Sequence, residues 1–574
     1  MQMDTTPQRF CTVESLLASE RQGVLAGLRI ASPDINYRMR AILVDWMMEV
    51  SKIFKLRTES FFASVVLVDS VIARYSGLKT SELQLYGVTA LWLAAKYHEI
   101  YPPDIGDVIF VCDNAFTAQQ ILEAEIIIFK IVGCNVNVPD MLQYLRVISN
   151  SSGSTTTSHN TAKGMLYLLS LRSTMFLPSV VVSAVRWLLA IVYNEQYVNA
   201  FEVPRNVVTE CVREVLERVS NAQNGLKLLA HTKTMKGQDR AEYLRVLRVL
   251  STALPPRIVL SNLTPYICNE FYAANLSLNL LSPAIVPADA PTLGAGTFGI
   301  VKRAEYDGKM FAVKQLNDNT NIYASYDGVP ASFLRETSIM QSLHHPNIAQ
   351  VRHITSDLQC IFLDLGKSDL DAWLGKNGPA DHAMQMQIAI QLLEALAYLH
   401  DIGCLHRDIK PKNIIVFDDV RLQLSDFGSG RGCQIALRGL HYTAGMCTLP
   451  YRSPEVLLGT AVYDDGLDCW SMLCTLYECA TGVVPFGQHT HDEIIVLLGI
   501  FSVLGTPTED TWPGVREMIG YPDAAPESER RVDILSGDQQ PSPCYRELME
   551  TGLVLNPAHR PRAHELLAIA QKYV

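Results

Sequence analysis

The chain has 574 residues, so a single hydrophobic core is not expected, and domains of ordinary size predict about two to four of them. Apolar residues make up 48% of the sequence and charged residues 19%, which excludes a largely disordered chain. The net charge of −11 disfavours nucleic-acid binding by the protein as a whole, because such binding needs Lys and Arg to neutralise phosphates; a local basic groove stays open.

The 13 cysteines are scattered and show no C-x-x-C spacing, which indicates reduced intracellular thiols rather than a zinc or redox site. Cys469 and Cys474 lie in an apolar run, and we expect both to be core residues. No apolar run reaches the roughly 18 to 20 residues of a membrane span, and the N-terminus lacks a signal pattern. We therefore expect a soluble intracellular protein without a membrane partner, in either nucleus or cytoplasm.

The first half of the chain is predicted to be helical. After an N-terminal extension (residues 1–36), residues 37–148 alternate apolar stripes at helical spacing with short breakers, as in ILVDWMMEVSKIF and LYGVTALWLAAKYHEI. The stretch 149–158, SNSSGSTTTS, cannot bury apolar area and predicts a loop or linker. It opens a second helical module, which we place at residues 149–255.

Prolines separate this half from the next. Pro255 and Pro256, followed by the three prolines of SPAIVPADAP, disfavour regular structure and predict an interdomain linker at residues 256–289. Short β-branched runs with glycine turns then predict a small sheet lobe at 290–366, and longer helical patterns a large lobe at 367–574. The expected fold is multidomain: an all-α tandem module followed by an α+β bilobal domain.

A glycine-rich stretch opens the second half. Gly294-Ala-Gly-Thr-Phe-Gly299 could bring backbone N–H groups close to phosphates, although this spacing alone is more often a hairpin turn. Lys314 then ends a strand-like run, FAVK, from which its ammonium can reach the α- and β-phosphates of ATP. Glu336, on a later helical pattern, can hold Lys314 in place.

Two further motifs supply the chemistry of phosphoryl transfer. His406-Arg-Asp-Ile-Lys-Pro-Lys-Asn413 offers Asp408 to accept a hydroxyl proton, Lys410 to stabilise the transferred phosphoryl group and Asn413 to bind Mg²⁺. Asp426, which begins Asp-Phe-Gly, offers the second metal ligand.

Together with Ser453-Pro-Glu455, for which Arg560 is the expected ion-pair partner, these motifs resemble the eukaryotic protein kinase family over residues 290–574. All catalytic positions are present, which disfavours a pseudokinase. The resemblance implies ATP and Mg²⁺ as cofactors. It also implies these ATP-binding residues: Leu293, Gly294, Gly296, Thr297, Gly299, Val301, Ala312, Lys314, Leu363, Asp364, Leu365 and Asp369.

Other segments resemble the cyclin-dependent kinases. Pro330-Ala-Ser-Phe-Leu-Arg-Glu336 is similar to the helix through which those kinases meet their cyclin, and residues 501–507 with 512–514 look like their insert in the large lobe. A phosphate on the activation segment would order it by pairing with guanidinium groups. The resemblance implies an activating phosphosite at Thr443 and three arginines that receive the phosphate: Arg335, Arg407 and Arg431.

The sequence also departs from that family. Phe298 stands where those kinases commonly carry a tyrosine, so inhibitory tyrosine phosphorylation should be lost. Pro450 stands where they usually carry a tryptophan, which affects the pocket for a substrate proline. Lys314 and Glu336 are 336 − 314 = 22 residues apart, a longer separation than is typical, so extra residues precede the regulatory helix.

The helical half carries its own resemblance. Met39 to Trp46 places apolar residues on one helical stripe, for which core packing is the simpler interpretation. This string, with Leu93 to Pro103 and Asp113 to Thr117, resembles the cyclin box of A- and B-type cyclins, and the half as a whole a tandem cyclin fold. It implies that Lys96 and Glu125 contact the kinase helix. It also implies a docking patch for Arg-x-Leu peptides: Met39, Ile42, Leu43, Trp46, Glu49 and Gln84.

The hypothesis from sequence is a cyclin fused to a cyclin-dependent kinase, which it activates in cis. The kinase would phosphorylate Ser or Thr followed by Pro, in a cell-cycle role, with an activating kinase for Thr443 as a possible partner. Two alternatives stay open: a docking scaffold that sequesters kinases or substrates, and a transcription-type kinase that acts on polymerase-tail repeats. Pairing in trans between two chains also stays open.

Overall fold

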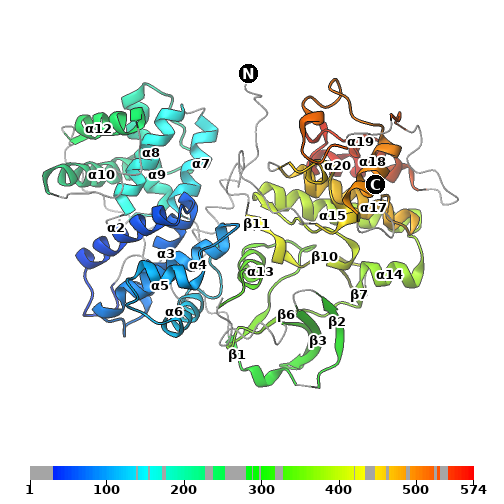
Figure 1. The fold of residues 1–574 in the computed structure, drawn as a ribbon, viewed down its shortest axis with the longest axis horizontal. Helices are drawn as coiled ribbons and strands as arrows, with labels where there is room; N and C mark the ends of the chain where they lie inside the picture. The colour runs from blue at the N-terminus through cyan, green and yellow to red at the C-terminus, as the bar shows by residue number, and fades with distance from the viewer. Residues whose placement is uncertain are drawn as a thin grey trace. The chain divides into compact units, whose positions relative to one another are not determined.

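The computed structural model describes residues 30–137, 140–152, 155–170, 176–225, 237–251, 280–287, 289–296, 299–316, 328–418, 420–432, 447–460, 464–486, 492–522, 527–530 and 541–573 (Figure 1). The chain divides into two compact units. The helical unit comprises the described parts of Thr12–Leu280 together with those of Asp318–Leu334. The bilobal unit comprises the described parts of Leu281–Asn317 and Arg335–Val574.

The first set of helices in the helical unit surrounds one central helix. In chain order the set is α2 (Tyr37–Ile53), α3 (Thr58–Arg74), α4 (Leu83–His98), α5 (Ile105–Val111) and α6 (Ala118–Ile131). Almost every residue of α4 is buried, because its apolar side chains occur on all faces and α2, α3 and α6 pack around it.

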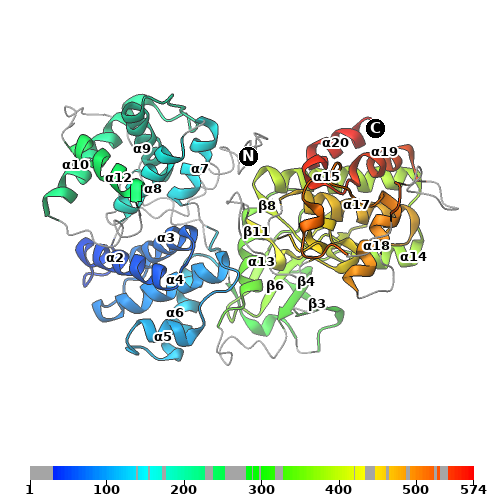
Figure 2. The same cartoon turned by 45° about the horizontal axis from the view of Figure 1, so that its top comes forward.

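A second set of helices follows: α7 (Met141–Ser152), α8 (Thr156–Ser170), α9 (Pro178–Tyr193), α10 (Arg205–Gly225) and α12 (Gly237–Ser251). Figure 2 shows the two sets as separate bundles, the first in blue and the second in cyan to green. The predicted loop at 149–158 is wrong for most of its length, because α7 continues to Ser152 and α8 begins at Thr156. Buried residues such as Leu145 and Ile148 hold α7 in place, and this packing overrides the weak helix propensity of its serines.

Arg40 ties the two sets of helices together. Its guanidinium on α2 makes two hydrogen bonds of 2.7 Å to the carboxylate of Asp69 on α3, and it donates a third of 2.6 Å to the carbonyl oxygen of Ser170 at the end of α8. Arg40 is 2% exposed, so its charge is tolerated because carboxylate and carbonyl replace its lost hydration. No motif in the sequence predicts this role for Arg40.

The small lobe of the bilobal unit is a six-stranded sheet of order β1-β5-β6-β4-β3-β2. Its strands are β1 (Leu280–Leu281), β2 (Thr292–Gly296), β3 (Gly299–Tyr306), β4 (Lys309–Leu316), β5 (His353–Thr355) and β6 (Cys360–Asp364). Leu281 packs with Phe311, Val313 and Phe362 in the core of this lobe. Residues 280–281 therefore belong to the sheet, and Pro283–Ile285 forms a short 3-10 turn, although we assigned both segments to the linker. Most of that linker, residues 256–279, lies outside the described residues.

The large lobe is built from helices around α17 (Gly466–Thr481), which is buried along most of its length. α15 (His382–Asp401) and α19 (Pro543–Gly552) pack on α17, and α20 (Ala563–Gln571) packs on both of them. Cys469 and Cys474 lie buried on α17, which confirms them as core residues. The large lobe also contains α14 (Leu370–Asn377), α16 (Pro454–Leu457) and α18 (Glu493–Leu504). Helix α13 (Ala331–Ser342) lies between β4 and β5 in the chain, and its first residues, through Leu334, belong to the helical unit.

Two small sheets carry the segment between the lobes and the loop that follows α15. One has the order β10-β9-β7, from β7 (Ser368–Asp369), β9 (Ile414–Val416) and β10 (Leu422–Leu424). The other pairs β8 (Cys404–Leu405) with β11 (Arg431–Gly432). None of the helices in the described ranges is both long enough and apolar enough to span a membrane.

Candidate catalytic site

Lys314 lies in the middle of the small-lobe sheet, where β4 pairs it with Val301 on one side and Ile361 on the other. Its Nζ atom is 2.8 Å from both carboxylate oxygens of Glu336 and 3.0 Å from Oδ1 of Asp426. Burial works to lower the pKa of Lys314, but the two carboxylates outweigh it and raise that pKa well above its usual value. The side chain therefore stays a fixed cation, as contact with phosphates requires.

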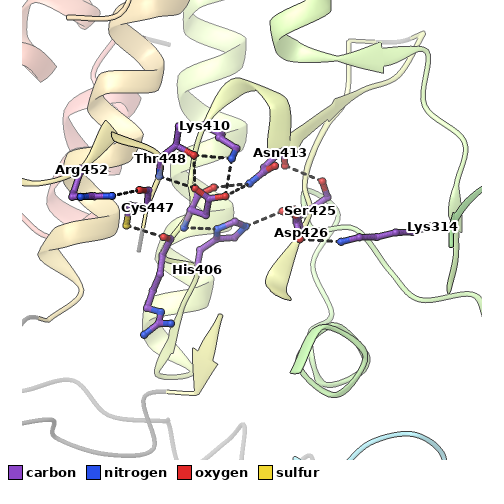
Figure 3. A network of polar contacts seen from close by, with 11 residues as sticks. Lys314, His406, Lys410, Asn413, Ser425, Asp426, Cys447, Thr448 and Arg452 are labelled. Atoms are coloured by element: carbon purple, nitrogen blue, oxygen red, sulfur yellow. Dashed lines mark hydrogen bonds and ion pairs between the residues drawn. The ribbon is translucent and has the colours of Figure 1, made fainter. Parts of the chain in front are cut away.

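Asp408 accepts hydrogen bonds from the side chains of Lys410, Asn413 and Thr448, which Figure 3 labels. Lys410 Nζ lies 2.8 Å and Asn413 Nδ2 3.1 Å from its Oδ2, and Thr448 Oγ1 lies 2.9 Å from its Oδ1. Burial works to raise the pKa of Asp408, but the hydrogen bond and charge of Lys410 outweigh it and lower that pKa. Asp408 is therefore ionised at neutral pH and can accept a proton from a hydroxyl group beside it.

Asn413 and Asp426 offer oxygens of the kind that Mg²⁺ prefers. Asn413 donates its Nδ2 to the carbonyl oxygen of Asp408 at 2.7 Å, and its own carbonyl oxygen accepts from the N–H of Ser425 at 2.8 Å. Asp426 has a φ of 64°, a left-handed conformation that is unfavourable for a residue with a side chain. An amide oxygen and a carboxylate beside a lysine would hold Mg²⁺, which would neutralise charge on phosphates there.

A buried aspartate anchors the loop that carries Asp408. Asp468 on α17 accepts the backbone N–H groups of His406 at 2.7 Å and Arg407 at 2.8 Å. His400 Nε2 lies 3.6 Å from Asp468. Burial works to lower the pKa of His400, but Asp468, Cys469 and Asp465 together outweigh it and raise that pKa to about 10. Sequence reasoning missed both His400 and Asp468; the signal was a lone carboxylate in the apolar run LDCWSML.

The segment before Glu455 has an unusual backbone. Cys447 adopts a φ of 65°, and its carbonyl oxygen accepts a hydrogen bond of 3.0 Å from Nη2 of Arg452. Nη1 of Arg452 pairs with Glu493 at the start of α18. The Cys447 thiol donates to the carbonyl oxygen of Arg407 at 2.7 Å, and burial raises its pKa to about 12, so it stays a thiol. Glu455 itself makes the expected ion pair with Arg560, at 2.8 Å for both oxygens.

The glycine-rich stretch forms the hairpin of β2 and β3. A Cβ on Gly299 would overlap the carbonyl oxygen of Gln315 on the adjacent strand, so the sheet itself requires this glycine. Gly294 has open space around it, so packing does not require a glycine there. Gly296 ends β2, whereas Thr297 and Phe298 lie outside the described residues. Leu293, beside Gly294, is 51% exposed.

The other predicted ATP contacts line the edge between the lobes. Ala312 pairs with Leu363 across β4 and β6, and Leu363 to Leu365 lead out of the sheet toward β7. The carboxylate of Asp364 accepts from Lys309 at 2.8 Å, which leaves its backbone as the part that could meet a ligand. Asp369 Oδ1 caps α14 by accepting the N–H of Ala372 at 2.7 Å. One of the two oxygens predicted to contact the ribose is therefore already bound to the helix.

Of the residues predicted to receive a phosphate, Arg407 has a φ of 67° and donates its Nε to the carbonyl oxygen of Ser429 at 2.8 Å. Arg431 lies on β11 and pairs with Leu405, two residues before Arg407. Arg335 lies on α13, next to Glu336. Thr443 lies outside the described residues.

Comparison with known proteins agrees with this geometry. Residues 288–573 match the family described as protein kinase domain, and residues 13–137 match the cyclin N-terminal domain. The "Cell division control protein 2 homolog 3" of Trypanosoma brucei brucei is 37% identical over 289 residues, which cover 48% of this chain and 88% of that relative. The "CTD kinase subunit alpha" of Schizosaccharomyces pombe is 34% identical over 281 residues, which cover 48% of this chain and 46% of that longer relative.

The chain belongs to the cyclin-dependent kinase family. It is an ATP-dependent Ser/Thr protein kinase whose first half carries a cyclin domain. ATP and Mg²⁺ are the cofactors that a protein kinase domain uses, and the oxygens of Asn413 and Asp426 beside Lys314 are the groups that fit them. When bound, the metal neutralises charge on the phosphates.

Within the cyclin part of the kinase, Lys96 and Glu125 form a buried ion pair of 2.6 Å. Segment 328–334, which the helical unit includes, lies on this pair. The N–H of Val329 donates to Glu125 Oε2 at 2.9 Å, and the carbonyl oxygen of Val329 accepts from Lys96 Nζ at 3.2 Å. Phe333 packs edge-on against Phe129 of α6, with ring centroids 6.5 Å apart. Both residues predicted to contact the kinase helix therefore lie on the segment that begins it.

The predicted docking patch lies on α2 and the start of α4. Leu43 is 5% exposed and lies against Gly87 of α4, so core packing explains this residue. Ile42 is 62% exposed. The remaining members are half-buried: Met39, Trp46, Glu49 and Gln84.

Proposed function

We propose that this protein is a proline-directed cyclin-dependent kinase that its own cyclin domain activates in cis. The observation that carries the proposal is the continuity of α13. Val329, just before α13, and Phe333 in its first turn contact the cyclin helices, and Glu336, one turn after Phe333, holds Lys314. A helix is stiff over this length, so fixing its first turn fixes the position of Glu336.

The catalytic roles follow from the contacts. Asp408 accepts the proton of the substrate hydroxyl, and Lys410, which bridges Asp408 and Thr448, stabilises the phosphoryl group in transfer. Lys314, held by Glu336, orients the phosphates, and Asn413 with Asp426 holds the metal. A phosphate on Thr443 would pair with Arg335, Arg407 and Arg431 and order the activation segment.

The backbone at Cys447 supports a preference for proline after the phosphorylated residue. Thr448 binds Asp408, so the residue that follows the substrate hydroxyl lies beside the backbone of Cys447. The Cys447 carbonyl oxygen already accepts from Arg452, so the N–H of an ordinary residue there would lose its partner. Proline has no N–H to satisfy and avoids this cost. The hydrogen bond from Arg452 to the Cys447 carbonyl oxygen is present although Pro450 stands where a tryptophan is usual.

Exposed Ile42 with half-buried Trp46 and Glu49 supports a docking patch, in which apolar residues take the leucine of an Arg-x-Leu peptide and Glu49 its arginine. Such a patch would select cell-cycle type substrates. The similarity to a CTD kinase subunit favours a second candidate, a transcription-type kinase for polymerase-tail repeats. Comparing kcat/KM for an Arg-x-Leu substrate and for a tail-repeat peptide separates the two.

The test is a phosphotransfer assay on the purified full chain without added cyclin, with Asp408→Asn as the inactive control. We expect transfer to a Ser-Pro peptide, and about tenfold or greater loss in the double variant Lys96→Met, Glu125→Gln, because the start of α13 then loses its support. An inactive chain, even after phosphorylation of Thr443, would refute self-activation. A biological effect that survives Asp426→Asn would favour the scaffold alternative instead.

A further inference from the structure

Gly328 lies at the closest approach between segment 328–334 and the cyclin helices. The next residue, Val329, is fully buried, and Lys96 and Glu125 bind both of its main-chain polar groups. Glu125 is also fully buried, and its Oε1 accepts from Lys96 at 2.6 Å while its Oε2 accepts from Val329. The ion pair thus replaces its lost hydration with the backbone of one residue.

The backbone and the space around Gly328 both demand a glycine. Its φ is +63°, a left-handed conformation that side chains rarely adopt. A Cβ built there would overlap Oε2 of Glu125 and would lie 2.9 Å from Cδ2 of Leu122 and 3.1 Å from Nζ of Lys96. A side chain at residue 328 would therefore collide with the carboxylate that holds Val329, and that carboxylate is locked by its own ion pair.

This arrangement decides what the cyclin face can recognise. Main-chain N–H and C=O groups are the same in every residue, so the hydrogen bonds to Val329 cannot by themselves distinguish one kinase segment from another. The missing Cβ of Gly328 can distinguish one segment from another, because any other residue at this position would clash with the buried carboxylate or displace it. The preceding residues, 317–327, lie outside the described residues.

We propose that Gly328 is the specificity-determining residue for self-activation: it lets the cyclin face accept a segment through its main chain and rejects a segment with any side chain at this position. The inference rests on the proposed function and adds the chemistry of the partner, a glycine in a left-handed conformation followed by a buried apolar residue. Gly328 acts as a positioning residue for Glu336 through α13 and does not touch the reacting atoms.

The experiment compares Gly328→Ala with Gly308→Ala in the full chain. Gly308 is a matched control, because its φ is +72° and a Cβ there has no atom within 4 Å. Both variants carry the backbone strain, but only Gly328→Ala carries the clash. We expect Gly328→Ala to lose kcat by about tenfold or more relative to Gly308→Ala, and hydrogen exchange at the Val329 amide to become faster. Equal activity and equal Val329 protection in the two variants would overturn the proposal.

A second substitution separates the clash from general damage. Glu125→Asp shortens the carboxylate, so in the wild type it should weaken the bond to Val329 and lower activity. In the Gly328→Ala background the same change makes room for the Cβ, and we expect it to raise activity and slow Val329 exchange. Equal losses in both backgrounds would contradict the steric argument. If the wild type itself is inactive the proposed function fails, while the Val329 exchange data still decide the role of Gly328.

Discussion

Glu336 holds Nζ of Lys314 between both of its carboxylate oxygens, at 2.8 Å each. We predict that Lys314→Met lowers kcat by about 100-fold, because a fixed cation at the phosphates is lost. Lys309→Met is the control, since Lys309 lies on the same strand but is 60% exposed and pairs with the carboxylate of Asp364, whose backbone is the part that could meet a ligand. Steady-state assays on both variants check this prediction. A comparable loss of kcat in both variants would show that replacing either lysine of β4 is harmful, whether or not it pairs with Glu336.

The buried His400 predicts a specific dependence of stability on pH. The pKa of His400 is raised from 6.5 to about 10 in the folded chain. Its contribution to the free energy of unfolding is therefore fully present below pH 6.5 and is lost as the pH rises toward 10. We expect the Tm difference between the wild type and His400→Gln to be largest near pH 6 and to shrink by about pH 9.5. His564→Gln, which removes a half-exposed histidine paired with Asp401, is the control. A His400 difference that stays constant over this range would contradict the raised pKa.

The bond from Arg452 to the Cys447 carbonyl oxygen predicts how substrate preference can be relaxed. In Arg452→Met that oxygen becomes available to the N–H of a residue other than proline. The ratio of kcat/KM for Ser-Pro over Ser-Ala peptides should fall by about tenfold. Glu493→Gln removes the other partner of Arg452 and keeps the Cys447 contact, so its ratio should stay near that of the wild type. If the ratio falls in Glu493→Gln and not in Arg452→Met, then α18, and not Cys447, sets the preference for proline.

The docking patch predicts a separation of KM from kcat. Trp46→Ala should raise KM about tenfold for substrates with an Arg-x-Leu motif and leave kcat unchanged, because the patch binds far from the transferred phosphate. Ile53→Ala is the matched control: Ile53 is 65% exposed on the same helix but lies outside the patch. Substrates without the motif should not distinguish the variants. An equal KM effect on both substrate classes would refute docking at this surface.

The catalytic residues could be found from sequence because their chemistry restricts them to fixed motifs. Lys314, Glu336, Asp408, Asn413 and Asp426 are far apart in the chain, yet each motif carries a residue type that phosphoryl transfer requires, and the structure brings them together. The motifs do not show which residues support the catalytic residues. Asp468 anchors the catalytic loop through backbone N–H groups, and although a lone carboxylate in the apolar run LDCWSML is a signal, the sequence does not show which groups it binds.

Packing accounts for the expectations that were wrong. The serines at 149–152 favour a loop by propensity, but the buried face of α7 stabilises the helix more than they destabilise it. Leu281 follows a long segment without periodicity, and only the folded sheet reveals that it completes a core with Phe311 and Phe362. Gly328 is one of 34 glycines, and neither its φ nor the carboxylate beside it can be read from the sequence.

The dependence of specific activity on chain concentration tests activation in cis most directly. A tethered cyclin meets its kinase at an effective concentration set by the linker, so activity per chain should not change when the purified protein is diluted from about 1 μM to about 1 nM without added cyclin. We predict a constant value over this range. A specific activity that rises in proportion to concentration would show that one chain activates another and would contradict the account.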